Sequence, residues 1–171
     1  MQVIIFFLFL FSTSLFSSEQ CKVDDLIMYN IASIEAHKDF PTGYPYIISL
    51  NNKKDYNQLK EDNLVKEMFL DKRTIHCLNQ KVCVLTLKYL IAKNIKNVDC
   101  GAFQLNYKFW KIPKKDYFDV RKSYDKACEI VMFYNKKEWT WENIAKYHSK
   151  TKVYNTRYKN ILLAKLERAI D

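Results

Sequence analysis

Glycine is nearly absent from this chain of 171 residues, because only Gly43 and Gly101 occur. Proline is almost as scarce, and the chain has no Gly- or Ser-rich linker, internal repeat or heptad pattern. These absences exclude a repeat protein and a coiled coil, and they favour one compact domain. A glycine this rare usually marks a backbone position that needs a positive φ or a close approach by another segment.

The chain also lacks the residue spacing of a metal site. Its three histidines are scattered, and neither Cys-x-x-Cys nor a zinc-type Cys/His pattern occurs. We therefore expect no metal and no cofactor. The five cysteines are an odd number, so at least one thiol is left over or pairs outside the chain. Cys77 and Cys83 are near neighbours and are the easiest pair to join.

Charge is missing from the first 18 residues, of which residues 3–16 are almost wholly apolar. This run is short for a membrane span and ends in Ser17-Ser18, which suits a signal peptidase. Met1-Gln2 lacks the usual Lys or Arg, which leaves an uncleaved anchor as the alternative. We predict a signal peptide over residues 1–18, a domain over residues 19–171, and a periplasmic location in which disulfides are tolerated.

The net charge of +9 belongs entirely to the segment after the apolar run. A basic surface favours a polyanion such as nucleic acid, anionic lipid or a carboxylate-rich cell wall. Export weighs against nucleic acid and leaves the wall as the expected partner.

Apolar residues at helical spacing predict a mostly helical chain. The fold class expected is α+β, predominantly α, with a helical core and at most a small β-hairpin. We expect a loop over residues 40–50 and a polar segment with room for the hairpin over residues 49–58. The expected helices cover residues 24–38, 58–72, 81–95, 119–136, 140–150 and 154–170.

Glu35 lies near the end of the first expected helix, beside Ile34 on the edge of its apolar stripe. Burial and the negative end of the helix dipole both disfavour a carboxylate, so this side chain is expected to hold a proton. A carboxyl group that stays protonated near neutral pH is what general acid catalysis needs. The alternative is a solvated glutamate at a helix end.

The stretch 97–106 (NVDCGAFQLN) contains the second glycine and several polar side chains. Turn residues lead into Gln104 and Asn106, which alternate with apolar residues. This pattern suits a loop that lines a groove for a ligand rich in hydroxyl and amide groups. A polar turn of purely structural importance is the alternative.

Three motifs in order resemble those of lytic transglycosylases of the soluble-lytic-transglycosylase (SLT) type, which have a goose-lysozyme-like fold. The segment 31–35 (IASIE), followed by 44–49 (YPYIIS), is similar to the helix that ends in the catalytic glutamate and to the Asn-Pro-x-x-x-Ser segment after it. The stretch 97–106 is similar to the family's Gly-x-x-Gln-Ile/Leu-Asn motif, and 144–149 (IAKYHS) to its Ala-x-Tyr-Asn/His motif. The resemblance covers about residues 24–166.

The resemblance implies that Glu35 protonates the glycosidic oxygen between N-acetylmuramic acid and N-acetylglucosamine. Glu35 then accepts the proton of the muramoyl C6 hydroxyl, which closes a 1,6-anhydro ring, so a second carboxylate is not needed. Peptidoglycan strands are the implied partner, a trans-envelope secretion or motility assembly is a second candidate partner, and a monomer is expected. The implied substrate-binding residues are Ser49, Gly101, Phe103, Gln104, Asn106, Tyr147 and His148.

The chain departs from the family pattern at several places. Ala36 replaces the usual Ser, Tyr44 stands where Asn is common, Phe103 replaces a frequent Met, and the segment between Glu35 and Pro45 is longer. Two alternatives therefore stay open. One is a lysozyme-like hydrolase that uses water and a second carboxylate such as Asp55 or Asp99, and the other is an inactive wall-binding subunit of an envelope assembly.

Overall fold

The computed structural model describes residues 21–170 as a predominantly helical α+β fold, which confirms the expected class at this level. The expected signal peptide, residues 1–18, lies outside the described residues. The helices are α1 Asp25–Glu35, α2 Lys53–Leu59, α3 Gln80–Ala92, α4 Val120–Tyr134, α5 Trp141–Ala145 and α6 Lys152–Ile170, with 3₁₀ turns at Lys66–Met68 (η1) and Asp116–Phe118 (η2). The strands are β1 Ile47–Leu50, β2 Thr74–His76, β3 Val98–Cys100 and β4 Leu105–Asn106.

Short polar side chains start four of the helices. Each side-chain oxygen accepts a hydrogen bond from an amide of the first turn, which has no partner inside the helix. The capping residues are Asp24 for α1, Asn79 for α3, Asp119 for α4 and Thr140 for α5. Local sequence therefore decides where these helices begin.

The four strands form one antiparallel sheet in the order β2-β1-β3-β4. Residues directly opposite one another in such a sheet share a face, so the register defines two rows. One row is apolar and buried: Ile75, Ile48, Cys100 and Leu105. The other row is polar: Thr74, Ser49, Asp99 and Asn106. The sheet thus turns one face to the core and offers a line of polar groups on the other.

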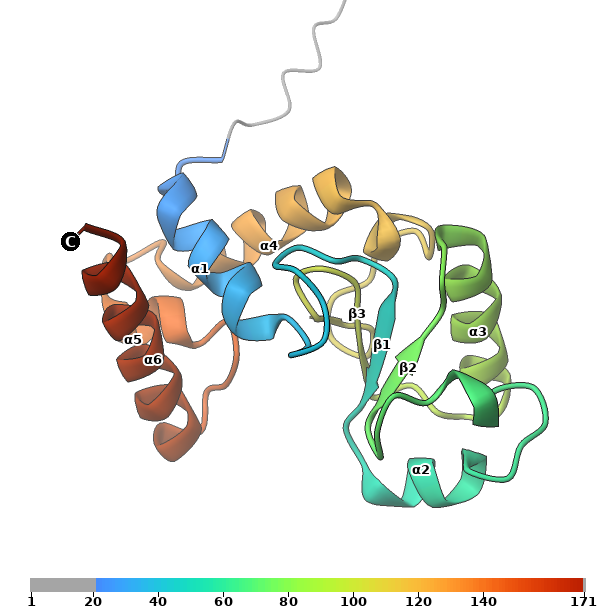
Figure 1. Cartoon of the computed structure of the whole chain (residues 1–171). Coiled ribbons are helices and arrows are strands. Elements are labelled where there is room, and N and C mark those ends of the chain that lie inside the picture. The colour runs from blue at the N-terminus through green and yellow to red at the C-terminus, as the bar shows by residue number, and fades with distance from the viewer. Residues whose placement is uncertain (1–20, 171) are drawn as a thin grey trace, which may run out of the picture.

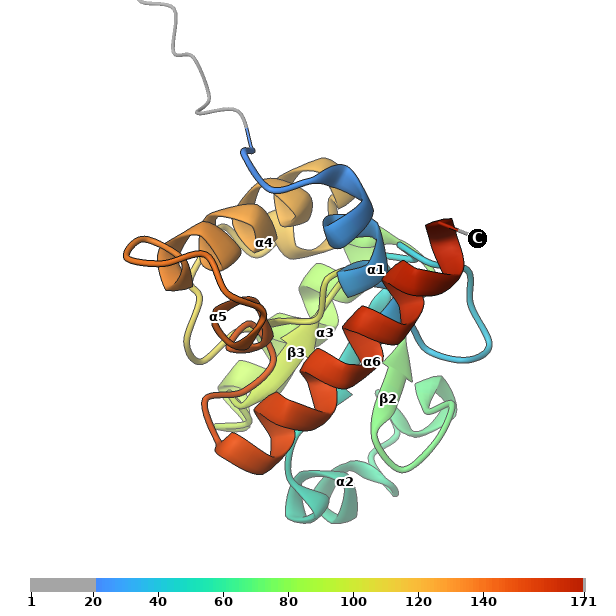
Figure 2. The ribbon, with the colours of Figure 1, turned by 90° about the vertical axis from the view of Figure 1, so that its left-hand side faces the viewer.

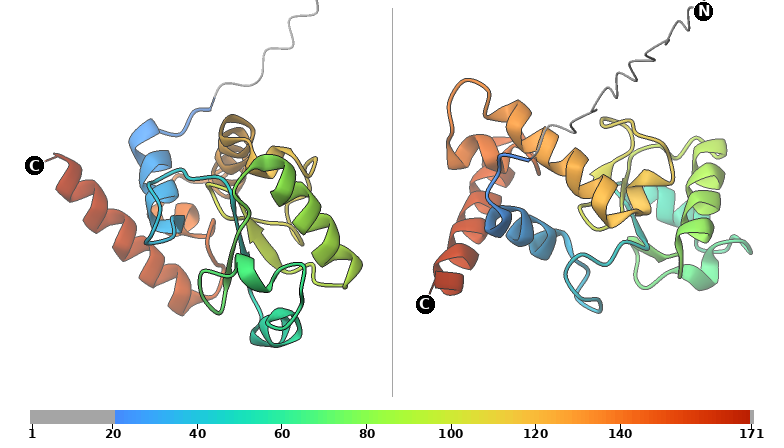
Figure 3. Two further views of the ribbon diagram at one scale, coloured as in Figure 1. Left: turned by 45° about the vertical axis from the view of Figure 1, so that its right-hand side comes forward. Right: turned by 90° about the horizontal axis from the view of Figure 1, so that it is seen from above.

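The helices lie on two sides of this sheet (Figure 1). On one side, α6 packs along α1 and α5, as the view in Figure 2 shows. On the other side lie α2 and α3, both of which contact β1. Helix α4 runs along the top of the molecule and contacts α1, α5 and η2 (Figure 3). No helix within residues 21–170 is long and apolar enough to cross a membrane.

The helix expected over residues 58–72 is wrong. Helix α2 ends at Leu59, and only the short η1 follows. The Asp62 side chain accepts a hydrogen bond from the Leu64 amide at 3.0 Å, and a second oxygen binds the Tyr89 hydroxyl and the Lys93 ammonium. A carboxylate that bonds its own backbone competes with helix formation, and here contacts from α3 hold it in the turn.

The expectation of at most one hairpin is also wrong, because the sheet has four strands among the described residues. Residues 47–50 of the expected loop form β1, and part of the polar segment 49–58 forms α2. The strands are only two to four residues long, which is too short for alternation to be recognised. Moreover, β1 pairs with β3, a segment about fifty residues away along the chain.

Two disulfides stabilise the fold. Cys77 pairs with Cys83, as expected from their spacing, and Cys21 pairs with Cys128 of α4. Cys100 of β3 remains a buried free thiol. The second disulfide joins the start of the described chain to α4.

Candidate active site

Glu35 is the last residue of α1, and Ala36 continues in an extended conformation. Its side chain is only 14% exposed, since Ile31 and Ile34 of the same helix pack into or against the core. The Oε1 atom of Glu35 is buried and makes no hydrogen bond within residues 21–170. A buried acceptor without a donor is costly in a folded protein, and the charged group nearest to this oxygen is the His148 imidazole.

His148, which follows α5, contacts this carboxyl group. Its Nδ1 lies 3.4 Å from Glu35 Oε1, and the imidazole is 45% exposed. The ring stacks on Tyr158 of α6 with a centroid separation of 4.8 Å and an interplanar angle of 7°. Tyr158 is buried, so it gives the imidazole a fixed support. The nearby Glu35 carboxylate raises the pKa of His148, and this effect outweighs the opposing effect of burial.

Two tyrosines complete the surroundings of Glu35. Burial raises the pKa of Tyr158 and of Tyr147, and the negative charge of Glu35 adds to both shifts. The Tyr147 hydroxyl donates a hydrogen bond of 2.5 Å to the carbonyl oxygen of Phe103. This bond ties the segment after α5 to the turn between β3 and β4. Both phenols therefore stay neutral, and Tyr147 acts as a hydrogen-bond donor.

The polar row of the sheet brings a second carboxyl group towards Glu35. Asp99 is mostly buried, and burial raises its pKa, with a further contribution from the charge of Glu35. Its Oδ1 accepts a hydrogen bond from Asn106 at 2.7 Å, and its Oδ2 lies 3.3 Å from the Arg73 guanidinium. Ser49 is buried beside Asp99 in the register. The two carboxyl groups thus lie within electrostatic reach of one another.

The turn between β3 and β4 explains the rare glycine. Gly101 has a φ of +76°, and a Cβ at this position would lie 1.8 Å from the carbonyl oxygen of Tyr117. Gln104 has a φ of +46° and donates from Nε2 to the Gly101 carbonyl at 2.8 Å. The Phe103 ring is buried against Tyr124 at a centroid separation of 5.8 Å. These contacts give Gly101 and Phe103 roles in packing, and the Phe103 side chain has little surface to offer a ligand.

The expected site residues therefore fall into three groups. Glu35, Tyr147 and His148 come together, and Ser49 and Asn106 line the facing polar row with Asp99. Gly101, Phe103 and Gln104 support that row through the turn.

Sequence reasoning missed two residues at this site, Tyr158 and Arg73. Tyr158 lies on α6, where Leu162 and Leu166 are ordinary core residues, and Arg73 follows an irregular segment. No local signal separates either residue from an ordinary structural one.

Asp55 does not join this group of side chains. It is buried at the start of α2, where it accepts a hydrogen bond from Asn52 at 2.9 Å. It lines a small hollow with asparagines and lysines.

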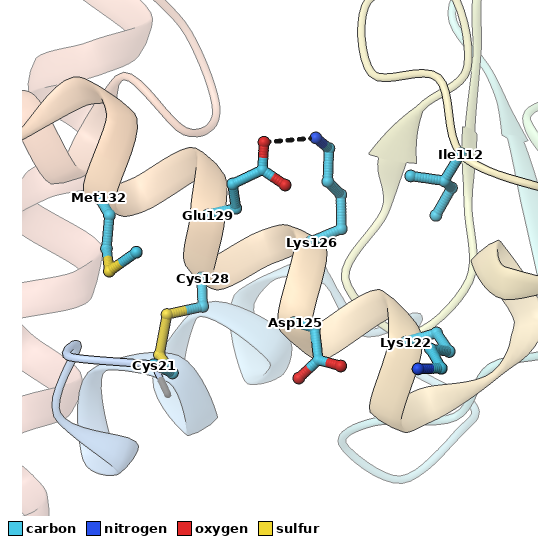
Figure 4. Close-up of a pocket in the computed structure, with 8 residues that line it drawn as sticks. All are labelled: Cys21, Ile112, Lys122, Asp125, Lys126, Cys128, Glu129 and Met132. Atoms are coloured by element: carbon cyan, nitrogen blue, oxygen red, sulfur yellow. Dashed lines mark hydrogen bonds and ion pairs between the residues drawn. A yellow bond between two sulfur atoms is a disulfide. The ribbon is translucent and has the colours of Figure 1, made fainter. Parts of the chain in front are cut away.

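A larger hollow, of about 450 Å³, lies along α4 beside the Cys21–Cys128 disulfide (Figure 4). The Lys126–Glu129 ion pair borders it, and neither Glu35 nor His148 lines it. Among the described residues, no three His, Cys, Asp or Glu side chains gather as metal ligands.

Comparison of the chain with protein-family models, with curated proteins and with solved structures finds no match. Chemical interpretation of the site therefore depends on the residues around Glu35.

Proposed function

We propose that this protein is a peptidoglycan lytic transglycosylase of lysozyme-like fold, with Glu35 as its general acid and then its general base. The observation that carries the proposal is the Glu35 Oε1 atom, which is buried, has no hydrogen-bond partner among residues 21–170, and lies 3.4 Å from His148 Nδ1. General acids in glycoside cleavage require a shielded carboxyl group that can reach the leaving oxygen.

The first step is proton transfer from Glu35 to the glycosidic oxygen. The positive charge that develops on the sugar is stabilised by the substrate's own 2-acetamido group. The C6 hydroxyl of the same muramoyl unit then attacks C1 and gives its proton to the Glu35 carboxylate. One carboxyl group is sufficient, because the nucleophile belongs to the substrate. The three supporting motifs are the IASIE helix end with the YPYIIS segment after it, the 97–106 turn, and the segment containing Tyr147 and His148.

His148 modulates the charge on Glu35 during this cycle. The Glu35 carboxylate raises the pKa of the imidazole, which means that the carboxylate and the imidazolium stabilise one another. After Glu35 has delivered its proton, this contact stabilises the carboxylate until the C6 hydroxyl returns a proton. Tyr158 holds the imidazole in place for this role by stacking.

The polar row of Ser49, Asp99 and Asn106 is where the acetamido and hydroxyl groups of the glycan would bind. These side chains come from three neighbouring strands and share one face of the sheet. The predicted export to the periplasm and the net charge of +9 suit a wall rich in carboxylates. A trans-envelope secretion or motility assembly would be a place in which such an enzyme acts, as a monomer.

A lysozyme-like hydrolase is the second candidate, and Asp99 is the observation that favours it. This carboxyl group feels the charge of Glu35 and has a raised pKa, as a residue that activates water across the substrate would. Its bonds to Asn106 and Arg73 favour a structural role instead.

The test is to digest purified peptidoglycan with the protein and to measure the masses of the products by mass spectrometry. A transglycosylase leaves 1,6-anhydromuramic ends, which are about 18 mass units lighter than hydrolysed ends because no water is added. Glu35→Gln should lower the rate on the order of 10²–10⁴-fold, whereas the exposed Glu167→Gln on α6 serves as the matched control and should leave it unchanged.

Reducing ends from the wild type, together with an equally severe loss in Asp99→Asn, would establish the hydrolase. Near-normal lysis by Glu35→Gln would end the assignment of the general acid.

A further inference from the structure

Two segments of the chain combine aromatic residues with lysines and contain no acidic residue. Residues 107–115 (YKFWKIPKK) carry four lysines, and residues 132–137 (MFYNKK) carry two. The first segment joins β4 to η2, and the second spans the end of α4. We call the surface that these segments form the basic aromatic face.

Ring contacts bring the two segments together. The Trp110 ring lies edge to face with Phe133 at 6.1 Å and with Tyr134 at 6.2 Å between centroids. Phe133 and Tyr134 also meet at 5.3 Å, with an interplanar angle of 70°. Phe109 is 66% exposed and Phe133 is 50% exposed, so large apolar groups remain in contact with water.

Each of the five rings carries a lysine ammonium over its face. The pairs are Lys111 over Tyr107, Lys108 over Phe109, Lys126 over Trp110, Lys136 over Phe133, and Lys150 over Tyr134, of which Lys126 and Lys150 come from outside the two segments. Among these five lysines, Lys126 alone is paired with an acid of residues 21–170, namely Glu129 at 2.7 Å. The face therefore combines positive charge with apolar rings over two segments that are distant in sequence.

This geometry discriminates between classes of ligand. Sugars and nucleic-acid bases bind by stacking on open ring faces, whereas here each ring has an ammonium over one face and several have a neighbouring ring at their edge. An anionic bilayer needs something different, namely ammonium groups at the level of the phosphates and apolar ring edges in the headgroup region. Lysines near an anionic lipid surface each strengthen binding on the order of fivefold.

From this charge complementarity and ring arrangement, we propose that the basic aromatic face docks the protein on the surface of an anionic phospholipid bilayer. The face belongs to the end of α4 and the β4–η2 connection, whereas α2 lies at the bottom of the molecule in Figure 1. The inference does not depend on the proposed function, since none of these residues belongs to the group around Glu35.

The experiment measures binding of the protein to vesicles of phosphatidylcholine alone and of phosphatidylcholine with phosphatidylglycerol. Of the three tryptophans, Trp110 belongs to the face, and Trp139 and Trp141 follow its second segment within four residues of sequence. Quenching of tryptophan fluorescence by brominated lipids therefore reports docking. We expect binding to the anionic vesicles only, with weakening at higher salt.

Charge-reversed variants locate the contact. Lys136→Glu with Lys137→Glu should weaken binding to anionic vesicles at least about 25-fold, because two lysines are lost. Lys53→Glu with Lys54→Glu changes the net charge equally but lies on exposed positions of α2, and it should bind nearly as the wild type does.

A second pair of variants tests the apolar part of the contact by replacing an exposed apolar side chain with serine, once on the face and once outside it. Phe109→Ser should weaken binding on the order of tenfold through loss of apolar burial, whereas the equally exposed Leu64→Ser, outside the face, should not. Equal losses in the two lysine pairs, or equal binding to neutral and anionic vesicles, would overturn the proposal. So would face variants that retain vesicle binding and lose binding to purified sacculi or to single-stranded DNA, because the occupant would then be the wall or a nucleic acid.

Discussion

The two glycines of the chain provide a matched pair of substitutions in which the same chemical change meets two different environments. Both have a positive φ, +82° at Gly43 and +76° at Gly101. A Cβ on Gly43 would have no atom of residues 21–170 within 4 Å apart from its chain neighbours, whereas a Cβ on Gly101 would lie 1.8 Å from the Tyr117 carbonyl oxygen. Gly43→Ala therefore measures the backbone cost alone, and Gly101→Ala measures the backbone cost together with the overlap.

The magnitudes can be estimated from these contacts. An alanine in the left-handed region costs about 1–2 kcal/mol, and restriction of the unfolded chain offsets about 0.4–1 kcal/mol of this. Gly43→Ala should thus destabilise the protein by about 1 kcal/mol. At Gly101 the overlap adds about 1–3 kcal/mol or more, because its partner is backbone. That backbone is also held firmly, since the Tyr117 hydroxyl donates to the Trp110 carbonyl at 2.6 Å.

Urea denaturation of the wild type and both variants measures the difference in free energy of unfolding. We expect Gly101→Ala to lose at least about 2 kcal/mol more than Gly43→Ala, on the overlap estimate above. This difference corresponds to a melting temperature lower by roughly 4–8 °C for a domain of this size. If the two variants agreed within about 0.5 kcal/mol, the close approach of η2 to Gly101 would be refuted.

Three further predictions concern the disulfides, His148 and salt. In a chain-entropy estimate, loss of the Cys21–Cys128 disulfide, which spans 107 residues, should lower the free energy of unfolding by about 4.8 kcal/mol, and loss of Cys77–Cys83, which spans 6, by about 2.2 kcal/mol. Urea denaturation of Cys21→Ser with Cys128→Ser, and of Cys77→Ser with Cys83→Ser, measures the two losses. Because His148 has a raised pKa in the folded protein, its contribution to stability is complete below the ordinary value of 6.5 and is lost as the pH rises through the raised value. The free energy of unfolding should fall over that interval in the wild type and not in His148→Gln, and a flat profile in both would contradict the contact with Glu35. Binding to purified sacculi should weaken as salt rises, since exposed charges are screened beyond about 8 Å at physiological ionic strength; salt-insensitive binding would indicate aromatic contacts instead.

Local sequence determined most of the helices. The predicted segments 24–38, 81–95, 119–136, 140–150 and 154–170 each overlap a helix of the structure. The first four of these helices end two to five residues earlier than predicted, and α6 begins two residues earlier. Their apolar spacing and their capping residues are both encoded within a few positions, so no distant contact is needed to recognise them. The pairing of Cys77 with Cys83 was predictable for the same reason.

Tertiary structure decided the sheet and the turn after α2. Strands of two to four residues carry no measurable alternation, and β1 finds β3 only when the whole chain folds. The Asp62 turn replaces a predicted helix because Tyr89 and Lys93 of α3 bind its carboxylate. Neither partner is visible in a local window of sequence.

The candidate site divides in the same way. The sequence by itself identified Glu35 at a helix end and the rare Gly101 as positions of interest. Only the fold shows that Gly101 is needed for the approach of Tyr117, that the Phe103 ring is buried, and that His148 lies against Glu35 Oε1. The physical reason is that residue type and spacing describe what a side chain can do, whereas burial, register and the direction of a hydrogen bond depend on segments that are distant in the chain.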